Sequence, residues 1–148
     1  MELESIGCAG VCTVIAPELQ TGGPVPPHDP LTVARKAYQA YVDKDRAAIE
    51  ALIGEPFSFT SPLDNRLDRA SYFERCWPNS SILSGFNFVN LVRNGDRVFV
   101  TYECTAASGK SFRNTEILTI ADGKIIDVEV YFGWSLPHEA PEGGSINP

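Results

Sequence analysis

Hydrophobic and polar positions follow two different periods along this chain, and the period changes near residue 86. Apolar residues between 31 and 42 recur three and four positions apart, with Arg35, Lys36 and Gln39 between them, which is typical of an amphipathic helix. From residue 86 to residue 134, four apolar runs are separated by short turns rich in Gly, Asn and Asp, which indicates β-strands joined by hairpins. The sequence therefore predicts helices first and a sheet second.

Two shorter helices are predicted before the hairpins. Asp45 can cap a helix over residues 46–53, and Asp68 can cap a third helix that runs to Trp77. A short strand over residues 57–60 lies between them. Helices that precede an antiparallel meander indicate an α+β fold. We expect a cone-shaped, curved antiparallel sheet capped by three N-terminal helices, with a pocket enclosed between the two layers.

Proline and glycine concentrate at both ends of the chain. Residues 1–30 contain five Pro and four Gly and no Lys or Arg, and residues 137–148 contain three Pro and two Gly. We therefore expect a flexible N-terminal arm over 1–30, one folded domain over 31–136 and a C-terminal tail over 137–148. Cys8 and Cys12 lie in the arm without a nearby His or second cysteine pair, so they predict no zinc site.

The formal net charge of -7 argues against a protein that binds nucleic acid. Most of this charge belongs to the arm and the tail, so the domain itself is close to neutral, which suits an apolar ligand. No stretch approaches the roughly 20 apolar residues that span a bilayer. Glu2 and Glu4 stand where a secretory signal peptide needs positive charge. We expect a cytoplasmic protein without a membrane partner.

The last predicted hairpin, which turns at residues 122–123, has two open registers. A two-residue loop places Glu116 opposite Glu129, so that like charges face each other across the strands. A three-residue loop with a glycine bulge places Glu116 opposite Val128 and leaves one face apolar except for Asn114 and Glu116. We favour the second register because it separates an apolar face from a polar one.

This register predicts that Glu116 points into the pocket. Desolvation there would raise the pKa of Glu116, and the protonated carboxyl would donate a hydrogen bond. The alternative is a glutamate near a strand end that reaches solvent. On the opposite, wet face, Arg113 can approach Glu129 across the strands.

The order of these elements resembles the nuclear transport factor 2-like superfamily, which includes ketosteroid isomerases and SnoaL-like polyketide cyclases. The resemblance extends over about residues 31–134. It rests on segments 37–43, 48–49, 59–62, 122–125 and 130–134. This fold carries enzymes and inert binding domains alike, so the resemblance implies the fold and leaves the reaction open.

The resemblance to the ketosteroid isomerases implies an oxyanion hole made of Tyr38 and Glu116. Tyr41 lies on the same helical stripe, so either tyrosine hydroxyl can enter the pocket. The isomerases carry an acidic base where this chain has Ser61, and a serine without a nearby His cannot take a proton from carbon. Asp64 is the nearest substitute for the base, with Asn65 beside it to orient a polar group. The alternative is that both are turn residues.

Several further side chains are predicted to contact the substrate, or to belong to the core instead. These are Tyr41, Ser61, Asn65, Trp77, Phe88, Tyr102, Phe112, Asn114, Val128, Phe132 and Trp134.

Two functions remain open at this stage. The first is an isomerase, cyclase or dehydratase without metal or cofactor, in which Tyr38 and Glu116 stabilise an enolate of a small apolar carbonyl compound and Asp64 moves the proton. The second is a non-catalytic ligand-binding or dimerisation domain. Ser61 at the position of the base favours the second, and the Tyr38/Glu116 pair favours the first. The resemblance implies a homodimer formed through the exposed face of the sheet.

Overall fold

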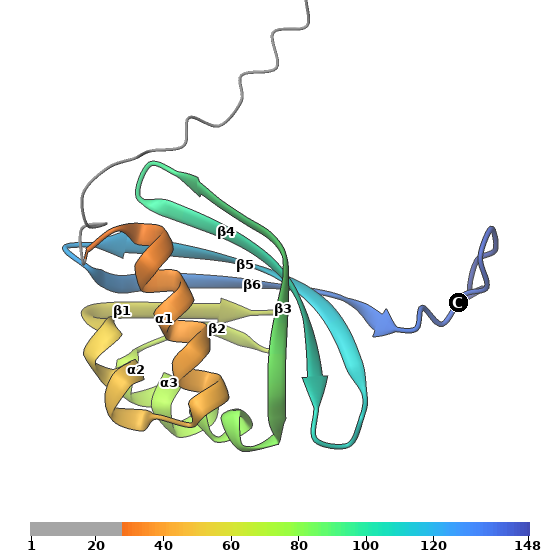
Figure 1. The fold of residues 1–148 in the computed structure, drawn as a ribbon, viewed down its shortest axis with the longest axis horizontal. Helices are drawn as coiled ribbons and strands as arrows, with labels where there is room; N and C mark the ends of the chain where they lie inside the picture. Colours follow the sequence, from red (N-terminus) through yellow and green to blue (C-terminus); the bar gives the residue numbers. More distant parts are fainter. Residues whose placement is uncertain (1–27) are drawn as a thin grey trace, which may run out of the picture.

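The computed structural model describes residues 28–148, so the predicted arm, with Cys8 and Cys12, lies almost entirely outside the described residues. Three α-helices, a 3-10 helix and six strands follow one another along the chain (Figure 1). They are α1 (Pro30–Asp43), α2 (Arg46–Leu52), β1 (Ile53–Ser61), β2 (Asp64–Leu67), α3 (Arg69–Arg75), η1 (Trp77–Ile82), β3 (Leu83–Asn94), β4 (Arg97–Ala106), β5 (Ser111–Ala121) and β6 (Lys124–Leu136).

An aspartate caps the N-terminus of each α-helix. The carboxylates of Asp29, Asp45 and Asp68 each accept a hydrogen bond from a backbone N–H three residues later. Each cap satisfies one of the N–H groups that the first turn of a helix leaves without a partner. The caps at Asp45 and Asp68 are therefore confirmed.

The ends of two helices differ from the prediction. Helix α2 ends at Leu52 and strand β1 begins at the next residue, so Gly54 lies within the strand. Helix α3 ends at Arg75, and Pro78 lies within η1, because proline is tolerated in the first turn of a helix.

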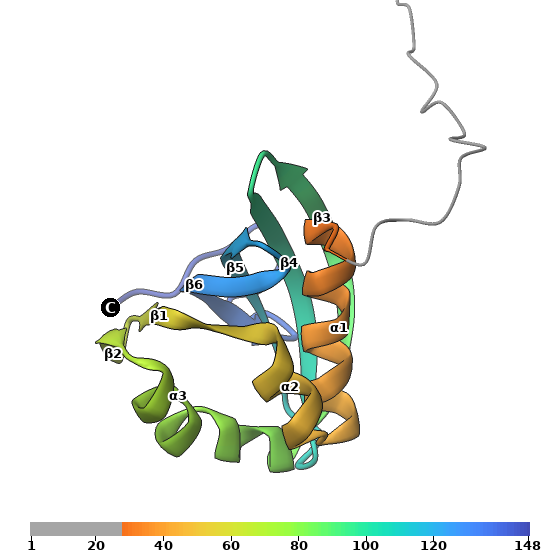
Figure 2. The same ribbon diagram turned by 90° about the vertical axis from the view of Figure 1, so that its left-hand side faces the viewer.

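The six strands form one curved, open sheet in the order β2-β1-β6-β5-β4-β3. The expected α+β fold is confirmed, with the three helices on the concave side of the sheet (Figure 2). Strand β1 runs parallel to β6, and the other pairs are antiparallel. The parallel pair joins segments far apart in the sequence, and no local pattern predicted it.

The favoured register of the last hairpin is wrong. Strands β5 and β6 are joined by a two-residue loop, Asp122–Gly123, in which both residues have positive φ. A bulge then follows the pair Ile120↔Ile125, and Glu116 stands opposite Val130. The favoured register placed one unpaired residue in the turn. In the structure the unpaired residue lies in strand β6, between Ile125 and Asp127. The register therefore shifts by two residues from the favoured one, and a shift of two leaves Glu116 on the same face.

The polar face of the sheet also differs from the prediction. Arg113 stands opposite Trp134, and its Nη2 lies 2.5 Å from Oε1 of Glu103 on the neighbouring strand β4. The predicted approach of Arg113 to Glu129 is therefore wrong, since the bulge moves Glu129 opposite Ile117.

The core lies between the concave face of the sheet and helices α1 and α2. Its fully buried side chains include Val33, Ile49, Val98, Val100 and Ile125. Within residues 28–148, no helix has the length and apolar character needed to cross a bilayer.

Candidate functional site

A cavity of about 320 Å³ lies between the sheet and the helices. Its volume is near the lower end of the range of small-molecule sites, about 300–1,000 Å³. Most of the wall is aliphatic or aromatic. The polar exceptions are Tyr38, Tyr41, Ser61, Asp64, Tyr72, Asn79, Tyr102, Asn114 and Glu116. A few polar groups in an apolar wall are typical of a site that orients a small ligand.

Glu116 is held in this cavity by two tyrosines from different elements. The Tyr38 hydroxyl, from helix α1, donates to Oε2 of Glu116 over 2.7 Å. The Tyr102 hydroxyl, from strand β4, donates to Oε1 over 2.8 Å. Each carboxyl oxygen therefore has one tyrosine partner, as a buried polar group requires.

Burial controls the protonation of these three groups. Desolvation raises the pKa of Glu116, and the hydrogen bonds from Tyr38 and Tyr102 partly oppose this rise. Burial and the nearby carboxyl raise the pKa values of both tyrosines, so both keep their protons. When Glu116 is protonated and both tyrosines donate to it, the acid proton of Glu116 is the hydrogen that this trio can offer to a ligand.

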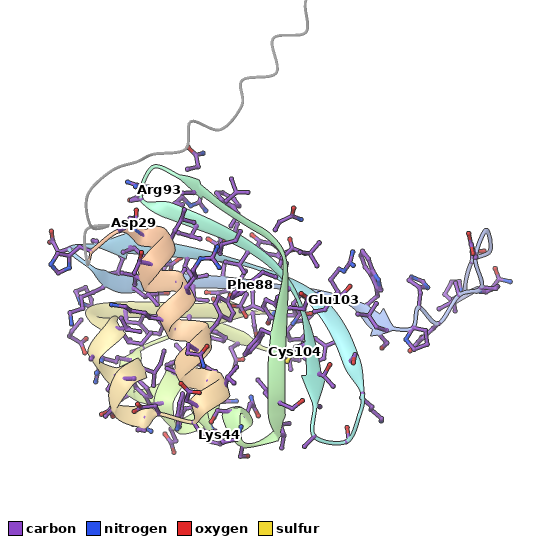
Figure 3. The ribbon with its side chains drawn as sticks, in the orientation of Figure 1. Asp29, Lys44, Phe88, Arg93, Glu103 and Cys104 are labelled. Atoms are coloured by element: carbon purple, nitrogen blue, oxygen red, sulfur yellow. The ribbon has the colours of Figure 1, made fainter. Side chains whose placement is uncertain are left out.

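Aromatic contacts fix the position of the Tyr38 ring. Phe86, Phe88 and Tyr102 lie with ring centroids 5.1, 5.2 and 5.6 Å from that of Tyr38. Phe88 projects from β3 beside helix α1 (Figure 3). The contacts with Phe86 and Phe88 are edge-on and the contact with Tyr102 is tilted, and together they hold the hydroxyl toward Glu116.

Asp64 lies on another part of the cavity wall, in the β1–β2 hairpin. Its side chain is 17% exposed, and Nε of Arg75 lies 3.8 Å from its Oδ1. The Ser61 hydroxyl donates to Oδ2 of Asp64 over 2.9 Å and accepts from the backbone N–H of Leu63 over 3.1 Å. Ser61 therefore positions the Asp64 carboxylate, which lines the cavity. The turn is formed by residues 62–63, and Asp64 and Asn65 are the first residues of β2, so the alternative that both are turn residues is wrong.

A second hydroxyl pair lies on the helical side of the cavity. The hydroxyls of Tyr41 and Tyr72 are hydrogen-bonded to each other. Trp77 packs against Tyr41 with ring centroids 4.9 Å apart, and Phe57 packs against Tyr72 at 5.1 Å. The sequence analysis did not name Tyr72. A tyrosine on the third predicted helix could have indicated a hydroxyl that faces the cavity.

The structure gathers most of the predicted site residues around one cavity and leaves four outside it. Those that line it are Tyr38, Tyr41, Ser61, Asp64, Tyr102, Phe112, Asn114, Glu116, Val128 and Phe132. Asn65 is exposed on β2, Trp77 and Phe88 pack behind Tyr41 and Tyr38, and Trp134 lines a separate groove near His138. Besides Tyr72, the prediction missed Cys76 and Asn79, which bring a thiol and an amide to the lining, and the apolar lining residues from α1, α2, β1 and the other strands, such as Phe59 and Phe86.

Among the side chains that the structure describes, no group of three or more His, Cys, Asp or Glu residues is arranged to hold a metal ion. The functional groups on the cavity wall are carboxyl, hydroxyl, amide and thiol groups.

Sequence comparison places this fold and cavity in a family. Residues 34–128 match the SnoaL-like domain. The chain belongs to the SnoaL-like domain family. The matched segment contains Tyr38, Asp64, Tyr102 and Glu116, and Val130 and Phe132 are the two lining residues that lie beyond it. No curated protein matches this sequence.

Solved structures similar to this SnoaL-like protein confirm the resemblance to nuclear transport factor 2-like proteins. One is an NTF2-like protein of unknown function from Cytophaga hutchinsonii, with 17% identity, a TM-score of 0.59, and coverage of 70% of this chain and 89% of that one. Another is a candidate ketosteroid isomerase from Kribbella flavida, with 16% identity, a TM-score of 0.62, and coverage of 80% and 90%. A third is a candidate polyketide cyclase from Sinorhizobium meliloti, with 17% identity, a TM-score of 0.57, and coverage of 67% and 93%.

Proposed function

We propose that this SnoaL-like protein binds a small, largely apolar carbonyl compound and catalyses proton transfer at the carbon next to the carbonyl. The observation that supports this function is the state of Glu116. It is buried in an apolar cavity, both of its oxygens accept hydrogen bonds from tyrosines, and its pKa is raised. Such a carboxyl holds its proton more strongly than an exposed glutamate, and when protonated it is a hydrogen-bond donor in a place that water does not easily screen.

Glu116 acts on the oxygen side of the ligand. Its acid proton is hydrogen-bonded to the carbonyl oxygen and stabilises the negative charge that develops there during enolisation. Tyr38 and Tyr102 act through Glu116, because their hydroxyls fix the plane of its carboxyl group. This differs from an oxyanion hole in which Tyr38 and Glu116 both contact the ligand.

Asp64 acts on the carbon side. Its carboxylate takes a proton from the carbon next to the carbonyl. The electron pair of that C–H bond forms the carbon–carbon double bond of the enol. The carbonyl oxygen takes the proton of Glu116. In a ligand with a carbon–carbon double bond one carbon beyond the reacting carbon, this enol is a dienol. Return of the proton from Asp64 to the far end of the diene moves the double bond into conjugation with the carbonyl and gives an isomer, while the enol proton returns to Glu116. The step needs no external oxidant or reductant. Ser61 keeps the Asp64 carboxylate oriented through its hydrogen bond.

The names of two structural relatives, a candidate ketosteroid isomerase and a candidate polyketide cyclase, agree with this reaction class. The reaction itself is argued from Glu116 and Asp64.

The second function is ligand binding without catalysis. It is favoured by the contacts of Asp64, whose two oxygens lie near Ser61 and Arg75. Both Asp64 oxygens therefore have partners within the protein, as a carboxylate with a structural role would.

Deuterium exchange separates the two functions without knowledge of the natural substrate. The ketone 1-tetralone is incubated with the protein in D₂O, and deuterium at the carbon next to its carbonyl is followed by mass spectrometry. We expect exchange faster than in buffer and a loss of about a hundredfold or more in Asp64→Asn and in Glu116→Gln. Asp96→Asn, a change in the exposed β3–β4 turn, is the matched control and should exchange like the wild type. Binding of the ketone without accelerated exchange would instead support the non-catalytic function.

A further inference from the structure

Three apolar residues that line the cavity are also exposed to solvent. Leu63, Ile82 and Phe132 are 79%, 54% and 52% exposed. They come from three separate places in the chain, namely the β1–β2 turn, η1 and β6. A residue that lines a cavity and is also more than half exposed lies where the cavity opens to solvent. We call these three residues the rim.

Strands β5 and β6 show how close the rim lies to Glu116. Val130 stands opposite Glu116 and is 8% exposed, whereas Phe132 stands opposite Asn114, two residues farther along each strand. All four residues line the cavity. Alternate residues of a strand share a face and lie about 6.6 Å apart. The wall therefore changes from buried to exposed within one such step from Glu116.

The rim is a concentration of exposed apolar residues at one site. Single exposed apolar residues are ordinary on protein surfaces. Eight large apolar residues of the described part of the chain are exposed, and three of these eight border this one cavity. A ligand that is confined to the buried part of the cavity leaves the rim in water. A ligand with an apolar group that projects past Phe132 removes both surfaces from water, which is favourable.

We propose that the rim binds an apolar chain that projects from the cavity while the carbonyl end of the ligand contacts Glu116. The substrate class is an uncharged cyclic ketone that carries an alkyl chain on the side of the ring away from its carbonyl. The rim residues determine specificity and take no part in the proton transfer. This inference rests on the proposed function, since Glu116 is the group that holds the carbonyl end.

A homologous series of ketones tests the contribution of the rim. The probes are 6-methyl-, 6-ethyl-, 6-n-propyl- and 6-n-butyl-1-tetralone, in which the chain is para to the carbonyl carbon. Dissociation constants are measured by amide chemical-shift titration of the full chain. We expect each added methylene group to tighten binding about two- to fourfold, because complete burial of one methylene group gives about fourfold. Affinity that stays constant or weakens along the series would overturn the inference.

Serine variants show whether the rim is the group that binds the chain. Leu63→Ser, Ile82→Ser and Phe132→Ser should each reduce the affinity ratio between the n-butyl and methyl probes by about threefold or more, with a smaller effect on 1-tetralone itself. Val92→Ser is the matched control, because Val92 is 56% exposed on β3 and does not line the cavity. It should keep the wild-type ratio.

Substitutions at exposed positions change stability little, so all four serine variants should fold. Rim variants that keep the wild-type ratio would place the alkyl chain against the buried wall and overturn the inference. An equal reduction in Val92→Ser would overturn it as well, since the effect would then not belong to the rim.

The same measurements separate this inference from the proposed function. Failure of all the tetralones to bind would overturn both. Deuterium exchange of 1-tetralone, together with affinities that do not depend on chain length, would overturn the role of the rim alone. A dependence on chain length that the rim variants remove, without exchange, would support the rim and remove the catalytic function.

Discussion

The hydroxyl of Tyr38 donates to Oε2 of Glu116 over 2.7 Å and links the first helix to a central strand across 78 residues of sequence. The two groups that the family resemblance assigns to an oxyanion hole therefore contact each other. The Tyr38 hydrogen is occupied, so a ligand that accepted a hydrogen bond from this pair would take it from a protonated Glu116. The protonation of Glu116 is therefore a property that measurements of stability should detect.

The free energy of unfolding should decrease as the pH rises through one particular range. In that range Glu116 is ionised in the unfolded chain and still protonated in the folded one. Burial raises the pKa of Glu116 in the fold, so above about pH 4.3, the usual pKa of glutamate, the unfolded chain loses a proton that the folded chain keeps. The unfolded state then binds fewer protons, and the free energy of unfolding decreases with pH until folded Glu116 ionises.

Urea unfolding at a series of pH values measures this contribution. Glu116→Gln cannot ionise, so the decrease attributable to Glu116 should be absent from its profile. Glu139→Gln, a change at an exposed position of the C-terminal segment, is the control and should follow the wild type. Identical profiles for the wild type and Glu116→Gln would contradict the raised pKa.

Loss of a tyrosine hydroxyl should raise the pKa of Glu116 further. The bonds from Tyr38 and Tyr102 favour its ionised form, so removing either one leaves the effect of burial less opposed. In Tyr38→Phe the aromatic contacts with Phe86 and Phe88 remain, and the stability loss should be about 1 kcal/mol.

Carbon-detected titration of labelled glutamates measures this shift directly. Tyr131→Phe is a matched control because it removes a tyrosine–glutamate bond to Glu129 on the exposed side of the sheet. It should leave the titration of Glu116 unchanged. A lowered pKa of Glu116 in Tyr38→Phe would show that the hydroxyl acts differently from a simple donor.

Gly123→Ala should destabilise the protein more than Gly95→Ala. Both glycines have positive φ, which costs an alanine about 1–2 kcal/mol. A Cβ at Gly123 would lie 2.1 Å from Nδ1 of His28, whereas a Cβ at Gly95 meets nothing within 4 Å. Thermal unfolding of the two variants therefore separates the backbone cost from the contact with His28. Equal losses would mean that the His28 ring moves aside without cost.

Asp29→Ala should cost more stability than Asp29→Asn. The Asp29 carboxylate caps helix α1 through the backbone N–H of Thr32, and its Oδ1 lies 3.2 Å from Nη1 of Arg93 in the β3–β4 hairpin (Figure 3). Alanine loses both contacts, whereas asparagine keeps the cap and loses only the ion pair. We expect about 1 kcal/mol or more for alanine. The ion pair alone should contribute a few tenths of a kcal/mol.

Arg93→Ala provides the independent check of that division. It removes the ion pair and the hydrogen bond from Arg93 Nε to the Gly95 carbonyl and leaves the cap intact, so its stability loss in urea unfolding should be at least that of Asp29→Asn and below that of Asp29→Ala. A stability loss as large as that of Asp29→Ala would show that the contact with the β3–β4 hairpin stabilises helix α1 more than the cap does.

The face on which Glu116 lies could be predicted although its register could not. Strand residues alternate between two faces, so any register that differs by two residues places Glu116 on the same side. The choice between a bulge in the turn and a bulge in the strand depends on packing against α2 and β1, which local sequence does not describe. The caps at Asp45 and Asp68 were predictable because a cap involves only neighbouring residues.

By itself the sequence determined the three α-helices, the caps at Asp45 and Asp68, the hairpin strands and the apolar face that carries Glu116, because these follow from local periodicity and short-range hydrogen bonds. It did not predict strand β2, the 3-10 helix η1 or the cap at Asp29. The tertiary structure alone decided that β1 pairs in parallel with β6, which brings Asp64 to the same cavity as Glu116. It also decided that Tyr41 meets Tyr72. These contacts depend on how a curved sheet and three helices pack together, and packing is a property of the whole chain.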